Sequence, residues 1–258
     1  MIDLMAQLTQ ATGLASSLLW QGLLVFMRVG SALSLIPAFG ERSVPQRVRL
    51  VIALAFSLVV LPSVSSETLL VSPAILPLLV EVVIGLLLGI SLRLFILALQ
   101  TAATIAAQAT TLSQMFGDAG PEPQPAIGNL MVMAALALAV ASGLHVQLAE
   151  FFILSYQFFP LAQLPEPADV TPWGVAEVSK GFALAFSLAA PFTIAALLYN
   201  ITLGVINRAM PALMVSFIGA PALTFGGLVL MALAVPLGLA LWLEMFQGFM
   251  ANPVSGLP

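Results

Sequence analysis

Four residues that could place charge and close contacts inside a membrane recur every four positions: Glu81, Gly85, Gly89 and Arg93. On an α-helix this spacing puts them along one face. The two glycines form a G-x-x-x-G face, which lets another helix approach closely. At a rise of about 1.5 Å per residue the two charges lie about 18 Å apart along the axis, so they cannot pair with each other.

A charged side chain at the centre of a bilayer costs roughly 2.5 to 3.5 kcal/mol on insertion scales. Glu81 and Arg93 therefore each require a partner on another helix or subunit, or contact with water. One interpretation is an ion or proton pathway, and the other is interhelical pairing that fixes assembly. The second is favoured because no further carboxylate lies nearby in the sequence to extend a proton relay.

A neutral polar stripe follows, on a segment otherwise made of alanine and other small residues. Its members recur at helical spacing and are Gln100, Thr101, Thr104, Gln108 and Thr111. The next stretch, residues 112–125, holds two glycines and three prolines that exclude regular helix. Irregular backbone at membrane depth must be buried in protein or line an aqueous cavity. This stretch is either a pore constriction, with Met115 and Phe116 as apolar occluders, or an ordinary solvent loop.

Other chemistry finds little support in the sequence. There is no Cys and one His, so neither a Cys-based zinc site nor a His-rich metal site can form within one chain. His145 and Glu150 do not share a helix face, and no nucleophile or phosphate-binding motif occurs. The net charge is −4, with no basic cluster suited to nucleic acid. We expect no enzyme activity, no metal, no cofactor and no nucleic-acid partner.

The elements that position these residues belong to an integral membrane protein, since 61% of the 258 residues are hydrophobic and 7% are charged. We expect an all-α fold in a single domain, residues 1–258. Six apolar runs are visible, at residues 14–36, 50–61, 73–99, 126–159, 181–206 and 214–250.

Several of these runs are irregular. The second has only twelve residues, which is short for a solitary span and suits a hairpin arm or a buried helix. The fourth is interrupted near Gly143 and is either one bent helix or two short ones. Pro191 predicts a kink in the fifth run. The sixth has three predicted break points, at Pro221, Pro236 and the Gly226-Gly227 pair.

Charge bias predicts an orientation in the membrane. Three of the seven basic residues lie in the loop at residues 38–49, and Arg208 follows the fifth run. By the positive-inside rule both regions are cytoplasmic, and the loops at 62–72 and 161–180 are outside. Six crossings with both termini outside satisfy this arrangement, if residues 126–159 count as one crossing.

A series of short motifs, spread in order over nearly the whole chain, resembles the FliR family. This family is the R component of the flagellar type III export gate, and its counterpart in virulence secretion systems is the T component. The motifs are Arg28; Pro37-Ala-Phe-Gly40; Val44-Pro-Gln-Arg-Val-Arg49; Leu61-Pro62; Glu81 with Gly85 and Gly89; Gln108 before the Gly/Pro loop at 117–125; Gly143-Leu-His145; Ser155-Tyr156 before Phe159-Pro160; Leu203-Gly-Val-Ile-Asn-Arg208-Ala-Met-Pro211; and Phe217-Ile-Gly-Ala-Pro221.

The resemblance implies a non-enzymatic channel subunit in a helical export-gate assembly, needed for flagellum assembly. One copy would join several P and Q membrane subunits, beside other membrane subunits of the apparatus. This multi-pass protein would lie among lipids of the bacterial inner membrane, at the flagellar basal body. Unfolded export substrates would pass through the assembly. A conduit for many sequences should bind none tightly, which suits the neutral stripe as channel lining.

The resemblance also implies roles for individual residues. The plug that closes the resting channel would be Leu112, Ser113, Gln114, Met115, Phe116, Gly117 and Asp118. Assembly or interhelical contacts would involve Arg28, Glu81, Gly85, Gly89, Arg93, Arg208 and Pro211. The alternative from another functional class is a secondary transporter that uses Glu81 as its coupling carboxylate.

Overall fold

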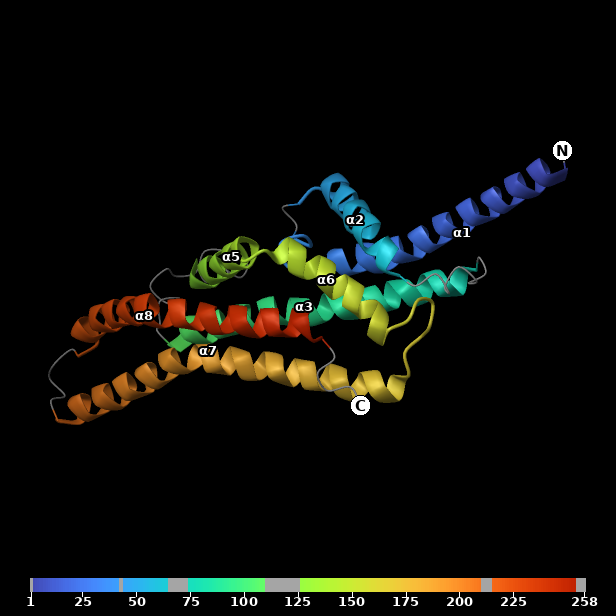
Figure 1. The fold of residues 1–258 in the computed structure, drawn as a ribbon. Helices are drawn as coiled ribbons and strands as arrows, with labels where there is room; N and C mark the ends of the chain where they lie inside the picture. The colour runs from blue at the N-terminus through green and yellow to red at the C-terminus, as the bar shows by residue number, and fades with distance from the viewer. Residues whose placement is uncertain (1, 42–43, 65–73, 110–125, 210–214, 254–258) are drawn as a thin grey trace. The chain divides into compact units, whose positions relative to one another are not determined.

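The computed structural model describes residues 2–41, 44–64, 74–109, 126–209 and 215–253, and every regular element in that part of the chain is helical (Figure 1). The all-α prediction is confirmed. The elements are α1 (Ile2–Leu33), α2 (Gln46–Val60), the 3₁₀ turn η1 (Leu61–Ser63), α3 (Ile75–Ala109), α5 (Ala126–Ala141), α6 (Leu144–Phe158), α7 (Pro167–Ala209) and α8 (Val215–Ala251).

Five or six segments are candidate membrane spans by length and composition, where six were expected. Five helices in the described part of the chain are long and apolar enough to cross a bilayer, and α5 and α6 make a sixth if this bent pair is one broken span. Gly143 separates the two helices and has a φ of 85°. Glycine adopts this left-handed conformation without steric cost, so the chain bends where the sequence indicated an interruption.

The second apolar run was predicted to be too short for a span, and this is wrong. Helix α2 begins at Gln46, four residues before the run, and the helical segment continues through η1 to give 18 residues, Gln46–Ser63. Gln46, Arg47 and Arg49 ended the apolar pattern but are all good helix formers. Counting apolar residues alone therefore underestimated the length of this helix.

The loop predicted at residues 161–180 is too long, because most of this segment is helical. It ends at Glu166, because α7 begins at Pro167 and runs for 43 residues. Proline is favoured at the first helical position, where its missing N–H would have no intrahelical partner. The predicted breaks in the last run do not end the helix, since α8 continues through Pro221 and Pro236. Membrane helices tolerate proline because neighbouring groups satisfy the freed backbone.

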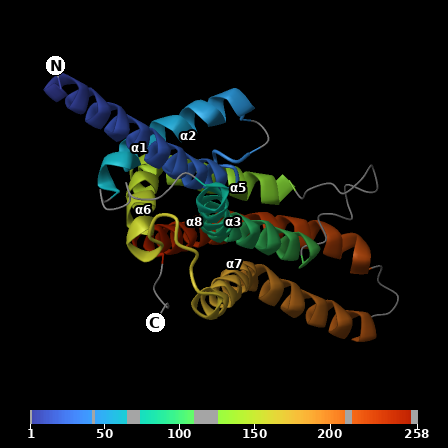
Figure 2. The same ribbon diagram turned by 90° about the vertical axis from the view of Figure 1, so that its right-hand side faces the viewer.

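The chain separates into two compact units. The first contains residues 1–93, 143–175 and 247–258, and the second contains residues 94–142 and 176–246. In the first unit α2 lies alongside α1 and α6 (Figures 1 and 2). A series of aromatic contacts crosses its core, with neighbouring ring centroids 5.8 to 6.1 Å apart. The rings belong, in order, to Phe39, Phe56, Phe152, Phe151 and Phe249.

The second unit packs around Trp242 of α8. Its ring stacks on Phe246 at a centroid distance of 4.9 Å, and Phe95 of α3 meets Phe246 edge to face at 5.4 Å. The buried indole Nε1 donates a 2.9 Å hydrogen bond to the Phe95 carbonyl. The large apolar ring is thus buried while its one polar atom is satisfied, which fixes α8 against residues 94–109 of α3.

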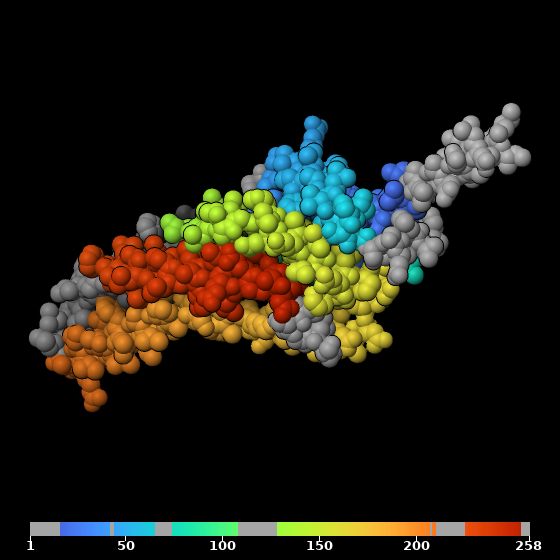
Figure 3. Space-filling model, in the orientation of Figure 1, coloured from blue at the N-terminus to red at the C-terminus, as the bar shows by residue number. Residues whose placement is uncertain are grey.

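Helix α2 lies on the surface of the first unit, where it is blue to cyan in Figure 3. It exposes a row of large apolar side chains, and these are Leu50, Val51, Leu54, Leu58 and Val59. Such a surface suits lipid or another membrane subunit rather than water.

Candidate functional site: a buried ion pair in the first unit

Two of the charges embedded in apolar runs meet inside the first unit. Arg28 of α1 and Glu81 of α3 are both fully buried, with side-chain exposures of 0%. Arg28 Nε donates to Glu81 Oε2 at 2.6 Å, and Nη2 donates to Oε1 at 3.1 Å. The guanidinium and the carboxylate thus form a bidentate pair, the strong and directional form of this interaction.

Helix α6 supplies further partners of Arg28. The remaining terminal nitrogen, Nη1, lies 3.3 Å from Ser155 Oγ and 3.4 Å from the Ser155 carbonyl oxygen. The Ser155 hydroxyl in turn donates to the Phe152 carbonyl at 2.7 Å. The Tyr156 ring covers the guanidinium, with Arg28 Cζ 3.8 Å from the ring centroid. A cation over an aromatic face is attracted by the ring quadrupole, most strongly where water is excluded.

The connection after α6 completes the site from the other side. The backbone N–H of Ala162 donates a 2.7 Å hydrogen bond to Glu81 Oε1. Ala162 has a φ of 61°, the left-handed conformation that non-glycine residues seldom adopt. The carboxylate therefore accepts three hydrogen bonds, and the site joins α1, α3, α6 and the turn that leads to α7.

This arrangement is electrically neutral and fully enclosed. Burying either charge alone would be very unfavourable in a medium of low dielectric constant, and the pairing offsets that cost only because its geometry is good and other donors are satisfied. Glu81 has no exposure to water. Its geometry is suited to holding helices in register rather than to exchanging protons or ions.

The glycine face explains how α1 and α3 come close enough for the pair. A Cβ on Gly85 would collide with Ser31 Oγ and with the carbonyl oxygen of Arg28 itself. A Cβ on Gly89 would lie 2.7 Å from the Ala32 carbonyl oxygen. The helix that the G-x-x-x-G face admits is thus α1 of the same chain, and glycine is required at both positions by this close approach.

Arg93 has a different kind of partner. Its Nη1 lies 3.5 Å from the carbonyl oxygen of Leu35, in the turn that follows α1. Carbonyl groups at a helix C-terminus lack intrahelical partners and carry partial negative charge. The positive charge of Arg93 therefore complements the partial negative charge at the C-terminal end of α1. Arg93 lies one turn of α3 beyond Gly89.

The other predicted site residues do not belong to this cluster. Thr104 is exposed on α3, and its hydroxyl donates to the Gln100 carbonyl at 2.9 Å. Gln100 and Thr101 are half-buried. The opposite face of this segment is buried alanine, at positions 102, 103, 106 and 107. Among the described members of the stripe, Thr104 is thus the exposed one, and it lies on a different side of the helix from the buried alanines.

Some predicted residues cannot be placed. The side chain of Gln108 lies outside the described part of the chain, as do Thr111, Pro211 and the whole predicted plug, residues 112–118. Arg208 is described and is exposed in the last turn of α7.

Sequence reasoning left the partner of Glu81 unidentified and gave no role to Tyr156 or Ala162. The sequence did contain a clue to this partner. Arg28, Glu81 and Arg93 are the charges deep within the first three apolar runs, and since only Glu81 is acidic, its partner could be sought among the two arginines. The role of Ala162 has no such signal, because its contribution is a backbone N–H.

Comparison with known proteins finds one family model and several relatives that agree with each other. The model of the family described as "Bacterial export proteins, family 1" matches residues 19–249. The flagellar biosynthetic protein FliR of Caulobacter vibrioides is 33% identical over 232 residues, which cover 87% of this chain and 92% of the relative. FliR of Escherichia coli is 28% identical, covering 90% and 92%, and FliR of Bacillus subtilis is 26% identical, covering 77% and 80%.

Proposed function

Because this chain belongs to the FliR family of bacterial flagellar export proteins, we propose that it is a structural channel subunit of the flagellar type III export gate. Membership makes it a multi-pass membrane protein of the flagellar export apparatus, in a family of non-enzymatic export components. The finer proposal is that it helps form and close the conduit for unfolded export substrates, in the inner membrane at the flagellar basal body.

One observation supports a structural role over the transporter alternative. A coupling carboxylate must exchange its ion or proton with water during each cycle. Glu81 is instead fully buried, bound to Arg28 by two hydrogen bonds and to the Ala162 N–H by a third. Releasing it would leave an unpaired charge in the interior, so the residue is better suited to hold the fold together.

The proposed partners are several copies of the P and Q membrane subunits, with one copy of this chain, beside other membrane subunits of the apparatus. Large apolar side chains are exposed on each of the long helices α3, α7 and α8 and on α2. In a membrane these faces can contact lipid or apolar faces of other subunits. Thr104, the exposed member of the described polar stripe, is better suited to a channel wall, since a neutral group holds no charged or apolar sequence tightly.

The proposal is tested by co-purification. The chain, tagged at its C-terminus, is expressed with its neighbouring genes, extracted in mild detergent and weighed as an intact particle. We expect a large particle with one copy of this chain and several copies of two smaller membrane proteins. A monomer or homodimer, with the neighbouring proteins expressed but absent from the particle, would refute the channel assignment and favour a transporter built around Glu81.

A further inference from the structure

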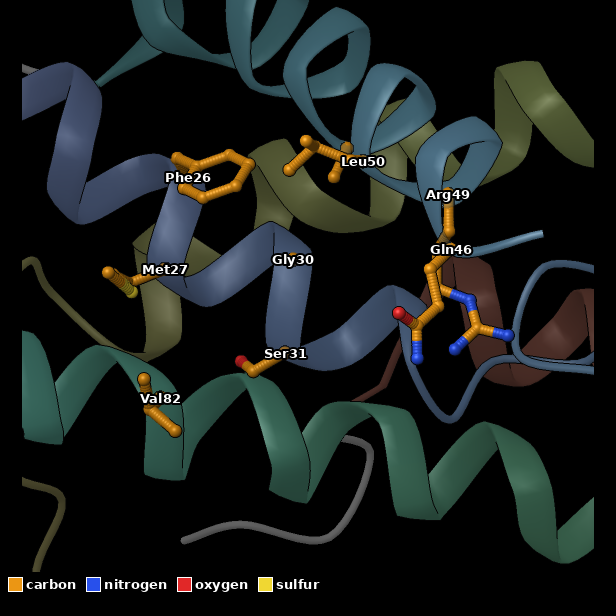
Figure 4. Close-up of a pocket in the computed structure, with 9 residues that line it drawn as sticks. Phe26, Met27, Gly30, Ser31, Gln46, Arg49, Leu50 and Val82 are labelled. Carbon is orange, nitrogen blue, oxygen red and sulfur yellow. The ribbon is translucent and has the colours of Figure 1, made fainter.

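A cleft opens in the first unit between α1, α2 and residues 75–93 of α3 (Figure 4). Its volume is about 280 Å³. Apolar side chains from all three helices form most of its walls, and these are Phe26, Met27, Leu50 and Val82. The cleft is small compared with pockets for drug-sized ligands, which range from about 300 to 1,000 Å³. It therefore fits part of a ligand rather than the whole of one.

The cleft is amphiphilic along its length. Gln46 and Arg49, both from the start of α2, stand together at one end, whereas Met27 and Val82 lie toward the other (Figure 4). A ligand that matches this pattern has a polar or anionic head and an apolar tail.

Arg49 is held in place without being neutralised. Its Nε donates to the Phe39 carbonyl at 3.0 Å, and its Nη2 donates to the Glu41 carbonyl at 3.0 Å. Both acceptors are backbone oxygens, so neither cancels the charge. Among the described residues Arg49 forms no ion pair, and its Nη1 has no acceptor. A guanidinium fixed in this way presents N–H groups in the planar arrangement that suits a phosphate.

We propose that the cleft binds a membrane phospholipid with an anionic headgroup, its phosphate at Arg49 and one acyl chain along Phe26, Met27 and Val82. The arginines of this region are expected at the cytoplasmic surface by the positive-inside rule, which is the level of the headgroups. Basic pockets between membrane helices on this side are favourable sites for anionic lipid. Exposed Arg47, two residues before Arg49, adds positive charge nearby.

The bound chain would fill the space that side chains leave between α2 and the α1–α3 pair. It would thereby support α2, which otherwise exposes most of its apolar residues. This inference goes beyond the export role, because it concerns what stabilises one helix rather than what passes through the gate.

The acyl-chain site is tested with two tryptophan variants of the protein in its export complex. Val82→Trp fills the apolar end of the cleft, whereas Val83→Trp places the same side chain at a neighbouring position that is 51% exposed and does not line the cleft. Each complex is loaded with phosphatidylglycerol or phosphatidylcholine and weighed by native mass spectrometry. We expect wild type and Val83→Trp to retain phosphatidylglycerol, and Val82→Trp to retain about tenfold less.

The headgroup site is tested by a second pair with matched loss of charge, Arg49→Gln and Arg47→Gln. A specific phosphate contact predicts that Arg49→Gln loses about tenfold in retention of phosphatidylglycerol, while Arg47→Gln loses clearly less. Equal retention by Val82→Trp and Val83→Trp would overturn the proposal, as would equal retention of the two lipids by wild type. A photo-crosslinker at Leu50 that captures another subunit instead of lipid would also overturn it, since protein would then cover the cleft.

Discussion

The backbone N–H of Ala162 lies 2.7 Å from Glu81 Oε1, although the two residues are 81 positions apart. The contact ties the turn after α6 to a carboxylate that already binds Arg28 of α1. Glu81 of α3 therefore links three segments of the chain, α1, α3 and the turn after α6. A structural role of Glu81 can be distinguished from a role in transport. The first predicts that Glu81→Gln lowers the stability of the fold, and the second predicts that it abolishes transport while the fold stays intact.

Glu81→Gln should destabilise the fold. The substitution keeps the shape of the side chain but leaves Arg28 charged and buried without a counter-ion, at a cost of about 3–5 kcal/mol. Thermal unfolding in detergent should show a lower Tm and a lower yield of folded chain. Glu244→Gln is the matched control, since Glu244 is an exposed carboxylate on α8 and should tolerate the change.

The double variant Arg28→Met/Glu81→Leu extends this test. Replacing both charges by apolar side chains removes the unpaired charge, so the double variant should be more stable than either single variant. If Glu81→Gln instead unfolds at the wild-type temperature and abolishes a transport activity, the structural interpretation of the pair fails.

Gly85→Ala should weaken the contact between α1 and α3, and Gly85→Leu should prevent assembly of the complex. The added Cβ overlaps the Arg28 carbonyl oxygen, and no change of side-chain rotamer can relieve a clash with backbone. Gly174→Ala in α7 is the matched control, since a Cβ there meets nothing within 4 Å. It should be neutral, or stabilising by about 0.5–1 kcal/mol. Normal yields of complex from both Gly85 variants would contradict the prediction.

The sequence-based predictions were accurate for features that depend on residues close together in the sequence, and they missed features that depend on distant residues. The helices, the bend at Gly143 and the close-packing face at Gly85 and Gly89 depend on residues within a few turns of each other, so periodicity and residue type were sufficient. Arg28 and Glu81 are 53 residues apart, and only the packing of α1 on α3 identifies them as partners. The start of α2 was missed because its first turn is polar, whereas the run was delimited by apolar residues alone.

Thr104 should contact export substrates in the assembled gate. It is the exposed member of the described polar stripe, on the face of α3 opposite the buried alanines. A photo-crosslinker placed at Thr104 should capture a substrate that is stalled during export, and the adduct is detected by its mass shift on a gel. The same group at Ala103, which is fully buried, serves as the control and should give no adduct. Failure to capture a substrate shown to be stalled in the gate would remove the stripe from the channel wall.

Deleting residues 112–117 should open the resting channel. This segment lies outside the described residues, and its assignment as a plug rests on the resemblance to the FliR family, with Met115 and Phe116 as the apolar tip. Assembly should survive the deletion, because the Arg28–Glu81 pair and the Gly85 contact lie in other segments. The conductance of the purified complex in a planar bilayer should rise, as should leakage of small solutes from cells.

A paired substitution separates the tip from the length of the segment. Replacing Met115 and Phe116 by serine keeps every residue of backbone but removes the apolar groups that would exclude water and ions from a narrow opening. Ser113→Ala is the control, because it changes a small side chain in the same segment without removing an apolar one. The plug assignment requires the serine double variant to conduct more than Ser113→Ala; if the deletion leaves the conductance of an intact complex unchanged, some other segment closes the channel.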